Sequence, residues 1–129
     1  MLVLDASAAV ELLLGTDRGR RVAAHLRDQL VVSPELLDVE VASAAARLER
    51  QAVLDRRSAD EVVELLAVLP VDRVPHELLL PRAWALRGSL RIADAFYVAC
   101  AEACSAVLLT CDARLARGVN GSTAVTIVS

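Results

Sequence analysis

The chain has 129 residues, of which 56% are hydrophobic and 24% charged, and this composition excludes a disordered or fibrous protein. The formal net charge is -3, lysine is absent, and aromatic residues make up only 2%. These features exclude a basic nucleic-acid coat, a base-stacking platform and any mechanism that needs a lysine. Three cysteines without a CxxC pair, no apolar run of membrane-spanning length and no signal-peptide pattern predict a cytoplasmic protein.

Short apolar or β-branched stretches predict five strands along the chain. They lie at residues 2–4, 30–32, 71–74, 106–110 and 124–128. Helical patterns separate them, at residues 7–14, 17–28, 33–51, 58–68, 76–86, 93–105 and from Asp112 to about 118. Ser7 and Ser33 are the expected N-caps of two of these helices, with Pro34 at the first helical position, and Ser58 opens a capping box.

Strands that alternate with helices predict an α/β fold, a parallel sheet with helices on both faces, in a single domain over residues 1–129. Functional sites in such sheets lie beyond the carboxyl ends of the strands. Two acids occupy this position, because Asp5 follows the first predicted strand and Asp112 follows the fourth.

Two further acids have apolar neighbours at helical spacing. Glu40 lies in LLDVEVASA and Asp94 opens DAFYVA. Acids rarely occupy such positions unless they are paired or bind a metal. If all four acids converge, their mutual repulsion requires either bound protons or a cation, and oxygen-only ligands favour Mg²⁺ or Mn²⁺.

Each acid also has a purely structural interpretation. Asp5, Asp94 and Asp112 could each cap a helix, and Glu40 could be a partly exposed helix acid. Ser7 and Thr110 could be a cap and a strand-end hydroxyl, or could hydrogen-bond a carboxylate or a metal-bound water. The joint pattern of four acids is more specific than any one of them.

In its ordered motifs the chain resembles the PIN domain family, and more narrowly the toxin subunits of bacterial VapBC toxin–antitoxin systems. The matching segments are residues 3–8 (VLDASA), 35–47 around Glu40, 92–99 (IADAFYVA) and 108–116 (LLTCDARLA). The resemblance implies a PIN-like three-layer sandwich around a five-stranded parallel sheet in the order 3-2-1-4-5. By position, Asp5, Glu40 and Asp94 match the family's three near-invariant acids, and Asp112 matches the fourth.

The resemblance further implies a Mg²⁺-dependent endoribonuclease, with Mn²⁺ as a substitute, whose catalytic and metal-binding residues are these four acids. Ser7 and Thr110 would support them, and Arg91 and Arg114, the arginines closest to the acids, would bind substrate phosphate. Some members carry another acid shortly after the fourth, where this chain has Ala113, Arg114 and Leu115. One metal ion and two therefore remain open alternatives.

The implied partners are an RNA substrate, a second copy in a homodimer, and an antitoxin whose tail would occlude the acidic pocket. The predicted helices also carry more apolar side chains than a small sheet can cover, most clearly Leu65, Leu66, Val68 and Leu69, and this favours a partner surface. The main alternative is a catalytically inactive PIN-like protein-binding module. A haloacid dehalogenase-type phosphatase and a receiver domain fit less well, because both need acids and a lysine that this chain lacks.

Overall fold

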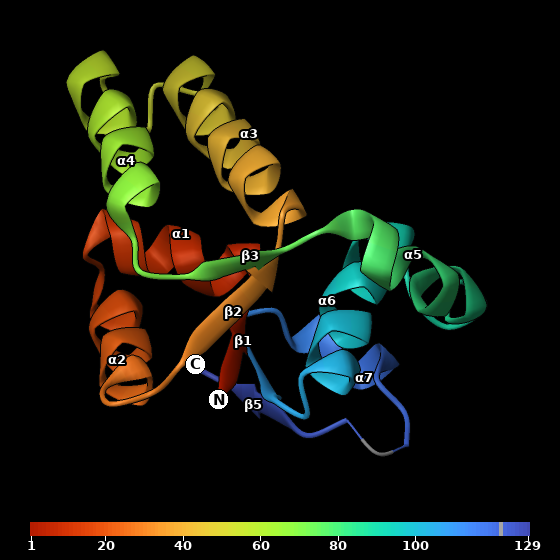
Figure 1. The fold of residues 1–129 in the computed structure, drawn as a ribbon. Coiled ribbons are helices and arrows are strands. Elements are labelled where there is room, and N and C mark those ends of the chain that lie inside the picture. Colours follow the sequence, from red (N-terminus) through yellow and green to blue (C-terminus); the bar gives the residue numbers. More distant parts are fainter. Residues whose placement is uncertain (122) are drawn as a thin grey trace.

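A computed structural model describes residues 1–121 and 123–129 and contains one five-stranded sheet (Figure 1). Its strands are β1 (Leu2–Leu4), β2 (Val31–Pro34), β3 (Asp72–Val74), β4 (Val107–Thr110) and β5 (Val125–Ile127). They follow the order β3-β2-β1-β4-β5, and every neighbouring pair is parallel. The expected fold class and strand order are confirmed.

Helices cover both faces of the sheet, so that the molecule has three layers (Figure 1). The first face carries α1 (Ala6–Leu14), α2 (Asp17–Leu26), α3 (Leu36–Arg50) and α4 (Arg56–Val68). The second face carries α5 (His76–Ala85), α6 (Ile92–Ala103) and α7 (Ala113–Gly118).

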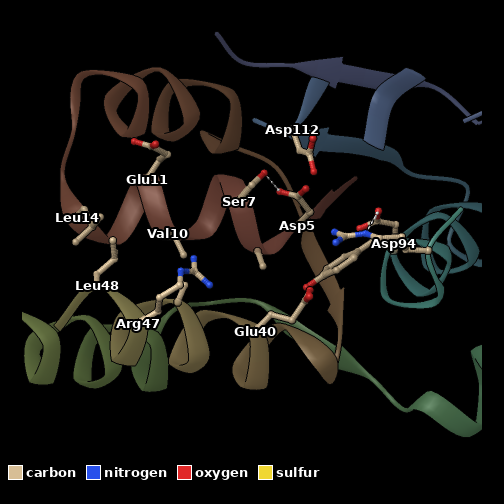
Figure 2. A pocket seen from close by; sticks show the side chains of 14 residues that line it. Asp5, Ser7, Val10, Glu11, Leu14, Glu40, Arg47, Leu48, Asp94 and Asp112 are labelled. Carbon is tan, nitrogen blue, oxygen red and sulfur yellow. Dashed lines mark hydrogen bonds and ion pairs between the residues drawn. The ribbon is translucent and has the colours of Figure 1, made fainter. Parts of the chain in front are cut away.

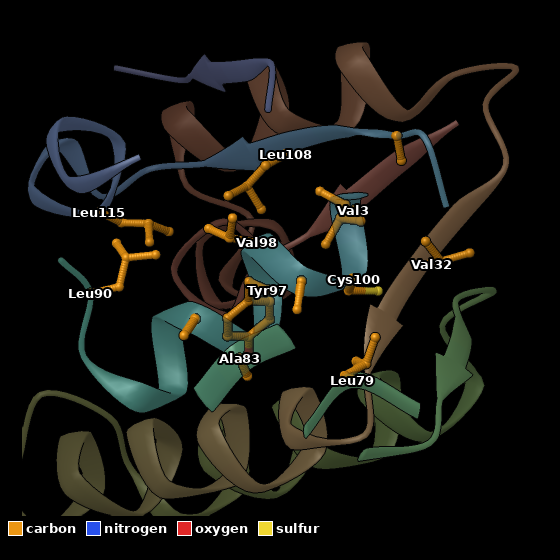
Figure 3. Packing of buried hydrophobic residues seen from close by; sticks show 14 residues of the cluster. Val3, Val32, Leu79, Ala83, Leu90, Tyr97, Val98, Cys100, Leu108 and Leu115 are labelled. Atoms are coloured by element: carbon orange, nitrogen blue, oxygen red, sulfur yellow. The ribbon is translucent and has the colours of Figure 1, made fainter. Parts of the chain in front are cut away.

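Successive residues of the central strands point to opposite faces and feed two separate cores. Val3 and Leu108 pack with α5, α6 and α7, as Figure 3 shows for that core. Leu4 and Leu109 pack with α1, α3 and α4. Since both faces of β1 and β4 are buried, these strands read as continuous apolar runs in the sequence.

The expected start of the third helix at Ser33 is wrong, because Ser33 and Pro34 belong to β2. The Ser33 hydroxyl is fully buried and donates to the Leu4 carbonyl at 2.8 Å. Pro34 pairs in register with Val74 at the end of the strand, and α3 begins only at Leu36. The serine therefore bonds across the sheet instead of capping a helix.

Two other helices begin earlier than expected, and an aspartate caps each of them. Asp5, not Ser7, caps α1 and accepts the Ala8 amide. Asp55 caps α4 and accepts the Ser58 amide, so Ser58 lies inside the first turn. Both aspartates satisfy a backbone N–H that has no partner within the helix.

The other sequence-based expectations concern cysteines, membrane spans and apolar excess. Cys100, Cys104 and Cys111 are all free thiols. Among the described residues, no helix combines the length and apolarity needed to span a membrane. Of the apolar residues on α4, Leu65 and Val68 are exposed, whereas Leu66 is buried in the core. The apolar surface left uncovered on this helix is therefore smaller than the sequence indicated.

Candidate active site

Asp5 lies at the carboxyl edge of the sheet, where the central strand β1 ends and α1 begins. Its side chain is held from two directions. Oδ1 accepts the Ala8 amide at 2.9 Å and the Ser7 hydroxyl at 2.7 Å, and Oδ2 accepts the Thr110 hydroxyl at 2.5 Å. The residue is only 3% exposed, so its carboxylate has a fixed position.

Burial also makes the negative charge of Asp5 costly. Desolvation raises its pKa from 3.8 to about 6, and the nearby charge of Asp112 adds to the increase. Hydrogen bonds from Thr110, Ala8 and Ser7 partly offset this increase. A carboxylate in this condition gains more from a nearby cation than an exposed one does.

Ser7 and Thr110 link the start of α1 to the end of β4. While each hydroxyl donates to Asp5, the Ser7 oxygen accepts the Cys111 amide at 3.0 Å and the Thr110 oxygen accepts the Asp112 amide at 2.9 Å. The structure therefore brings both hydroxyls to a carboxylate, as one of the two interpretations of the sequence expected.

Asp94 and Asp112 lie close enough to share one arginine. Asp94 is buried in the first turn of α6, and Asp112 caps α7 by accepting the Arg114 and Leu115 amides. The Arg114 guanidinium donates to Asp94 Oδ2 at 3.3 Å and to Asp112 Oδ2 at 3.0 Å. Arg91 Nε approaches the same Asp94 oxygen at 3.4 Å. Both arginines expected at the phosphate thus contact the acids.

Glu40 reaches the site from α3 and lies beside the buried Tyr97 of α6. Burial raises the pKa of the Tyr97 hydroxyl, and the Glu40 carboxylate raises it further. Even so, the contact lacks hydrogen-bond geometry, and the Tyr97 hydroxyl has no partner among the described residues. Glu40 and Tyr97 therefore place an acidic and an unsatisfied polar group side by side.

All four acids line one cavity of about 490 Å³ between α1, α3 and α6. Figure 2 shows Asp5, Asp94 and Asp112 at one end of it, with Glu40 approaching from the opposite wall. The other end is formed by Val10, Leu14 and Leu48 and includes Arg47 and Glu11 (Figure 2). The cavity thus joins an acidic end to an apolar end.

The donor types fit a hard divalent cation, because the acidic end offers only carboxylate and hydroxyl oxygens and no nitrogen or sulfur ligand. The raised pKa of Asp5 and the unpartnered Tyr97 hydroxyl also indicate an environment that a cation would relieve. Over residues 1–121 and 123–129, however, no three His, Cys, Asp or Glu side chains are close enough together to hold a metal ion. A cation shared by these acids would therefore need side chains other than that of Asp5 to shift.

Tyr97, Glu11 and Arg47 line the cavity, although the sequence did not identify them as site residues. Helical spacing was the signal that could have found them. Tyr97 lies three residues after Asp94, Glu11 four residues after Ser7, and Arg47 seven residues after Glu40, so each shares a helix face with a predicted site residue.

Carboxylates from four separate segments at the carboxyl edge of a 3-2-1-4-5 parallel sheet are the arrangement expected of a PIN-like domain. Comparison with known families agrees, since the PIN domain family matches residues 2–119. The chain belongs to the PIN domain family and, within it, to the VapC ribonucleases.

The similarity to individual VapC proteins extends over nearly the whole chain. This chain is 42% identical to Ribonuclease VapC12 of Mycobacterium tuberculosis over 100% of both chains. It is 44% identical to Ribonuclease VapC3 of the same organism, over 90% of this chain and 85% of the other.

Two crystal structures have the same fold. PAE2754 from Pyrobaculum aerophilum aligns with a TM-score of 0.67 and 25% identity, over 96% of this chain and 81% of the other. VapC20 of Mycobacterium tuberculosis, described as a Sarcin-Ricin loop cleaving toxin, aligns with a TM-score of 0.66 and 16% identity, over 91% and 94%. At 16% identity the likeness to VapC20 concerns the fold alone.

Proposed function

We propose that this protein is a Mg²⁺-dependent endoribonuclease and the toxin of a type II toxin–antitoxin pair. One observation carries the proposal: the carboxylates of Asp5, Glu40, Asp94 and Asp112 line a single cavity at the carboxyl edge of the sheet. Similarity to proteins named VapC ribonucleases supports RNA as the substrate and a VapB-type antitoxin as the partner.

The acids would hold the cation, with Asp5 and Asp94 as the central ligands and Glu40 or Asp112 completing the set. When bound, Mg²⁺ would lower the pKa of a coordinated water and offset negative charge on the phosphate. Ser7 and Thr110 would keep Asp5 in place through their hydrogen bonds. Arg91 and Arg114 would bind phosphate oxygens, because a guanidinium presents two parallel donors to such a group.

The proton of the attacking water would pass to a carboxylate, because neither His25 nor His76 lines the cavity. His76 instead accepts the Leu36 amide at 2.8 Å and joins the start of α5 to the start of α3. Since water and not the ribose 2′-hydroxyl attacks phosphorus, we expect products with 3′-hydroxyl and 5′-phosphate ends.

The test is cleavage of structured RNA by the purified protein with Mg²⁺, with EDTA, and with Mn²⁺ in place of Mg²⁺. Asp5→Asn should abolish cleavage, whereas Asp55→Asn should not, because Asp55 also caps a helix but lies outside the cavity. A folded protein that cuts no RNA with either metal, while still binding an antitoxin, would favour the inactive binding module.

Exposed apolar side chains support a protein partner and a homodimer. One set lies on α3 and α4 and comprises Val39, Val63, Leu65 and Val68. Another lies on α5 and comprises Leu78, Leu80 and Trp84. Sedimentation at micromolar concentration tests the homodimer, which a monomer under these conditions would rule out. A cytoplasmic location remains a prediction from the cysteines.

A further inference from the structure

Arg114 makes the only contact by which one cation bridges two of the four acids among the described residues. Arg114 lies at the start of α7. Its Nη1 donates to Oδ2 of Asp94, and its Nη2 donates to Oδ2 of Asp112. Arg91 reaches Asp94 alone, through a longer contact of 3.4 Å. Arg114 is therefore the arginine that joins two acids of the cavity, whereas Arg91, which lines the cavity itself, pairs with one.

This guanidinium and a divalent cation need the same negative charges. Asp94 and Asp112 line the cavity, whereas Arg114 does not, so it approaches the two acids from the rim. The Arg114 side chain is 48% exposed and the Asp94 side chain only 10%. The arginine can thus move into solvent on a flexible stem, while the acid stays buried.

We propose that Arg114 is an internal counter-cation that competes with the metal for Asp94 and Asp112, and that metal binding frees it to take a phosphate of the RNA. The proposal rests on the proposed nuclease function. It gives one side chain two consecutive ionic partners: first the acids, then the substrate.

The physical argument is electrostatic. Removing a positive charge within ion-pair distance of two acids leaves the pocket more negative, which strengthens its attraction for a divalent cation. An arginine that only orients Asp94 would have the opposite effect, because its loss would loosen a metal ligand. The sign of the change in metal affinity separates these two roles.

The first experiment is calorimetric titration of the full-length protein with Mn²⁺ at pH 7.5. We expect Arg114→Ala to bind Mn²⁺ about fivefold more tightly than wild type, the factor that corresponds to losing an ion pair of about 1 kcal/mol. Arg114→Lys keeps the positive charge but lacks the two parallel donors of the guanidinium. Its affinity for Mn²⁺ should lie between those of wild type and Arg114→Ala. Melting curves should show that Mn²⁺ raises the melting temperature of Arg114→Ala more than that of wild type.

Arg82→Ala is the matched control. Arg82 forms a two-point ion pair with Glu102 at 2.6 and 3.2 Å, away from the acidic cavity. Its removal also releases a carboxylate from an arginine, so it reproduces the loss of an ion pair. We expect no change in the affinity of the site for Mn²⁺.

The second experiment measures RNA binding in a Glu40→Gln background that prevents cleavage, at a Mg²⁺ concentration shown by titration to saturate this variant. Adding Arg114→Ala should weaken binding, and the slope of log Kd against log salt concentration should fall by about one. Tighter metal binding together with weaker RNA binding is the expected signature. A purely structural role for Arg114 would not move the two affinities in opposite directions.

The outcomes separate this proposal from the nuclease function. An active wild type whose Mn²⁺ affinity is unchanged or weakened by Arg114→Ala overturns the role of Arg114 and leaves the nuclease function standing. Tighter Mn²⁺ binding with unchanged RNA binding overturns the transfer of Arg114 to phosphate. If neither wild type nor Arg114→Ala binds Mn²⁺, the metal-dependent function itself is wrong.

Discussion

Replacing Asp5 by asparagine should stabilise the protein in EDTA at neutral pH, although it removes a central residue of the site. The rise in the Asp5 pKa from 3.8 to about 6 means that its ionised form costs the fold about 3 kcal/mol. Asparagine has one acceptor oxygen where Asp5 has two, and Asp5 receives three hydrogen bonds. This mismatch costs about 1–2 kcal/mol, which leaves a net gain of about 1–2 kcal/mol.

The gain should depend on pH with a defined sign. Between about pH 4 and 6 the folded wild type holds a proton on Asp5 that the unfolded chain releases, so wild-type stability falls as pH rises through this window. Asp5→Asn does not lose stability in this way, because an asparagine side chain does not ionise. Its melting temperature should exceed that of wild type by about 3–8 °C at pH 7.5, and at pH 4, where only the hydrogen-bond mismatch remains, it should fall below that of wild type.

Scanning calorimetry at the two pH values is the measurement, with Asp55→Asn as the control. Asp55 also accepts a backbone amide at a helix start, but it is exposed and hydrogen bonding lowers its pKa. Its replacement should leave the melting temperature at pH 7.5 unchanged or slightly lower. An Asp5→Asn variant that is no more stable than wild type at pH 7.5 would refute the argument that burial of this charge strains the fold.

Three further predictions concern other parts of the structure. Mg²⁺ affinity measured by calorimetry should fall as pH drops below about 6, because Asp5 then takes up a proton that the cation must displace. Equal affinities at pH 5 and pH 7.5 would contradict this prediction. Asp94→Asn should lower RNA cleavage by at least about 100-fold without raising the melting temperature, because Arg91 loses its ion pair and Arg114 loses one of its two. A clear rise in melting temperature would mean that the ion pairs to Asp94 are not formed in solution. Gly19→Ala should destabilise the protein by about 2–4 kcal/mol in urea, since a Cβ would lie 2.0 Å from a backbone oxygen of α1, whereas Gly88→Ala, which meets nothing within 4 Å, should not.

The sequence predicted the layers of the fold better than the starts of its helices. Doubly buried strands leave a local signature of consecutive apolar residues, and β1 and β4 show it clearly. The role of Ser33 was not visible, because its partner, the Leu4 carbonyl, lies 29 residues away in the chain and becomes its neighbour only when β1 and β2 pair. A local capping rule could not anticipate that competing bond.

The candidate site shows the same division between local and distant interactions. The positions of Asp5 and Asp112 followed from the strands that precede them, and the structure places both at the cavity. The bond from Arg114 to Asp94 spans 20 residues and joins two helices, so the sequence indicated a phosphate ligand and not a partner of the acids. The sequence suggested mutual repulsion among the four acids, but at Asp5 burial is the larger cause of the raised pKa and the charge of Asp112 the smaller one.

The bond from Thr110 to Asp5 joins residues 105 positions apart, so the first and last thirds of the polypeptide must meet before the acidic end of the cavity exists. During synthesis the Asp5 segment leaves the ribosome long before β4 has been translated. A growing chain therefore lacks the complete set of acids until β4 and Asp112 join the sheet, and we expect a chain that ends before Thr110 to be unable to cleave RNA. With this topology, the proposed nuclease site can form only when synthesis of the chain is nearly complete.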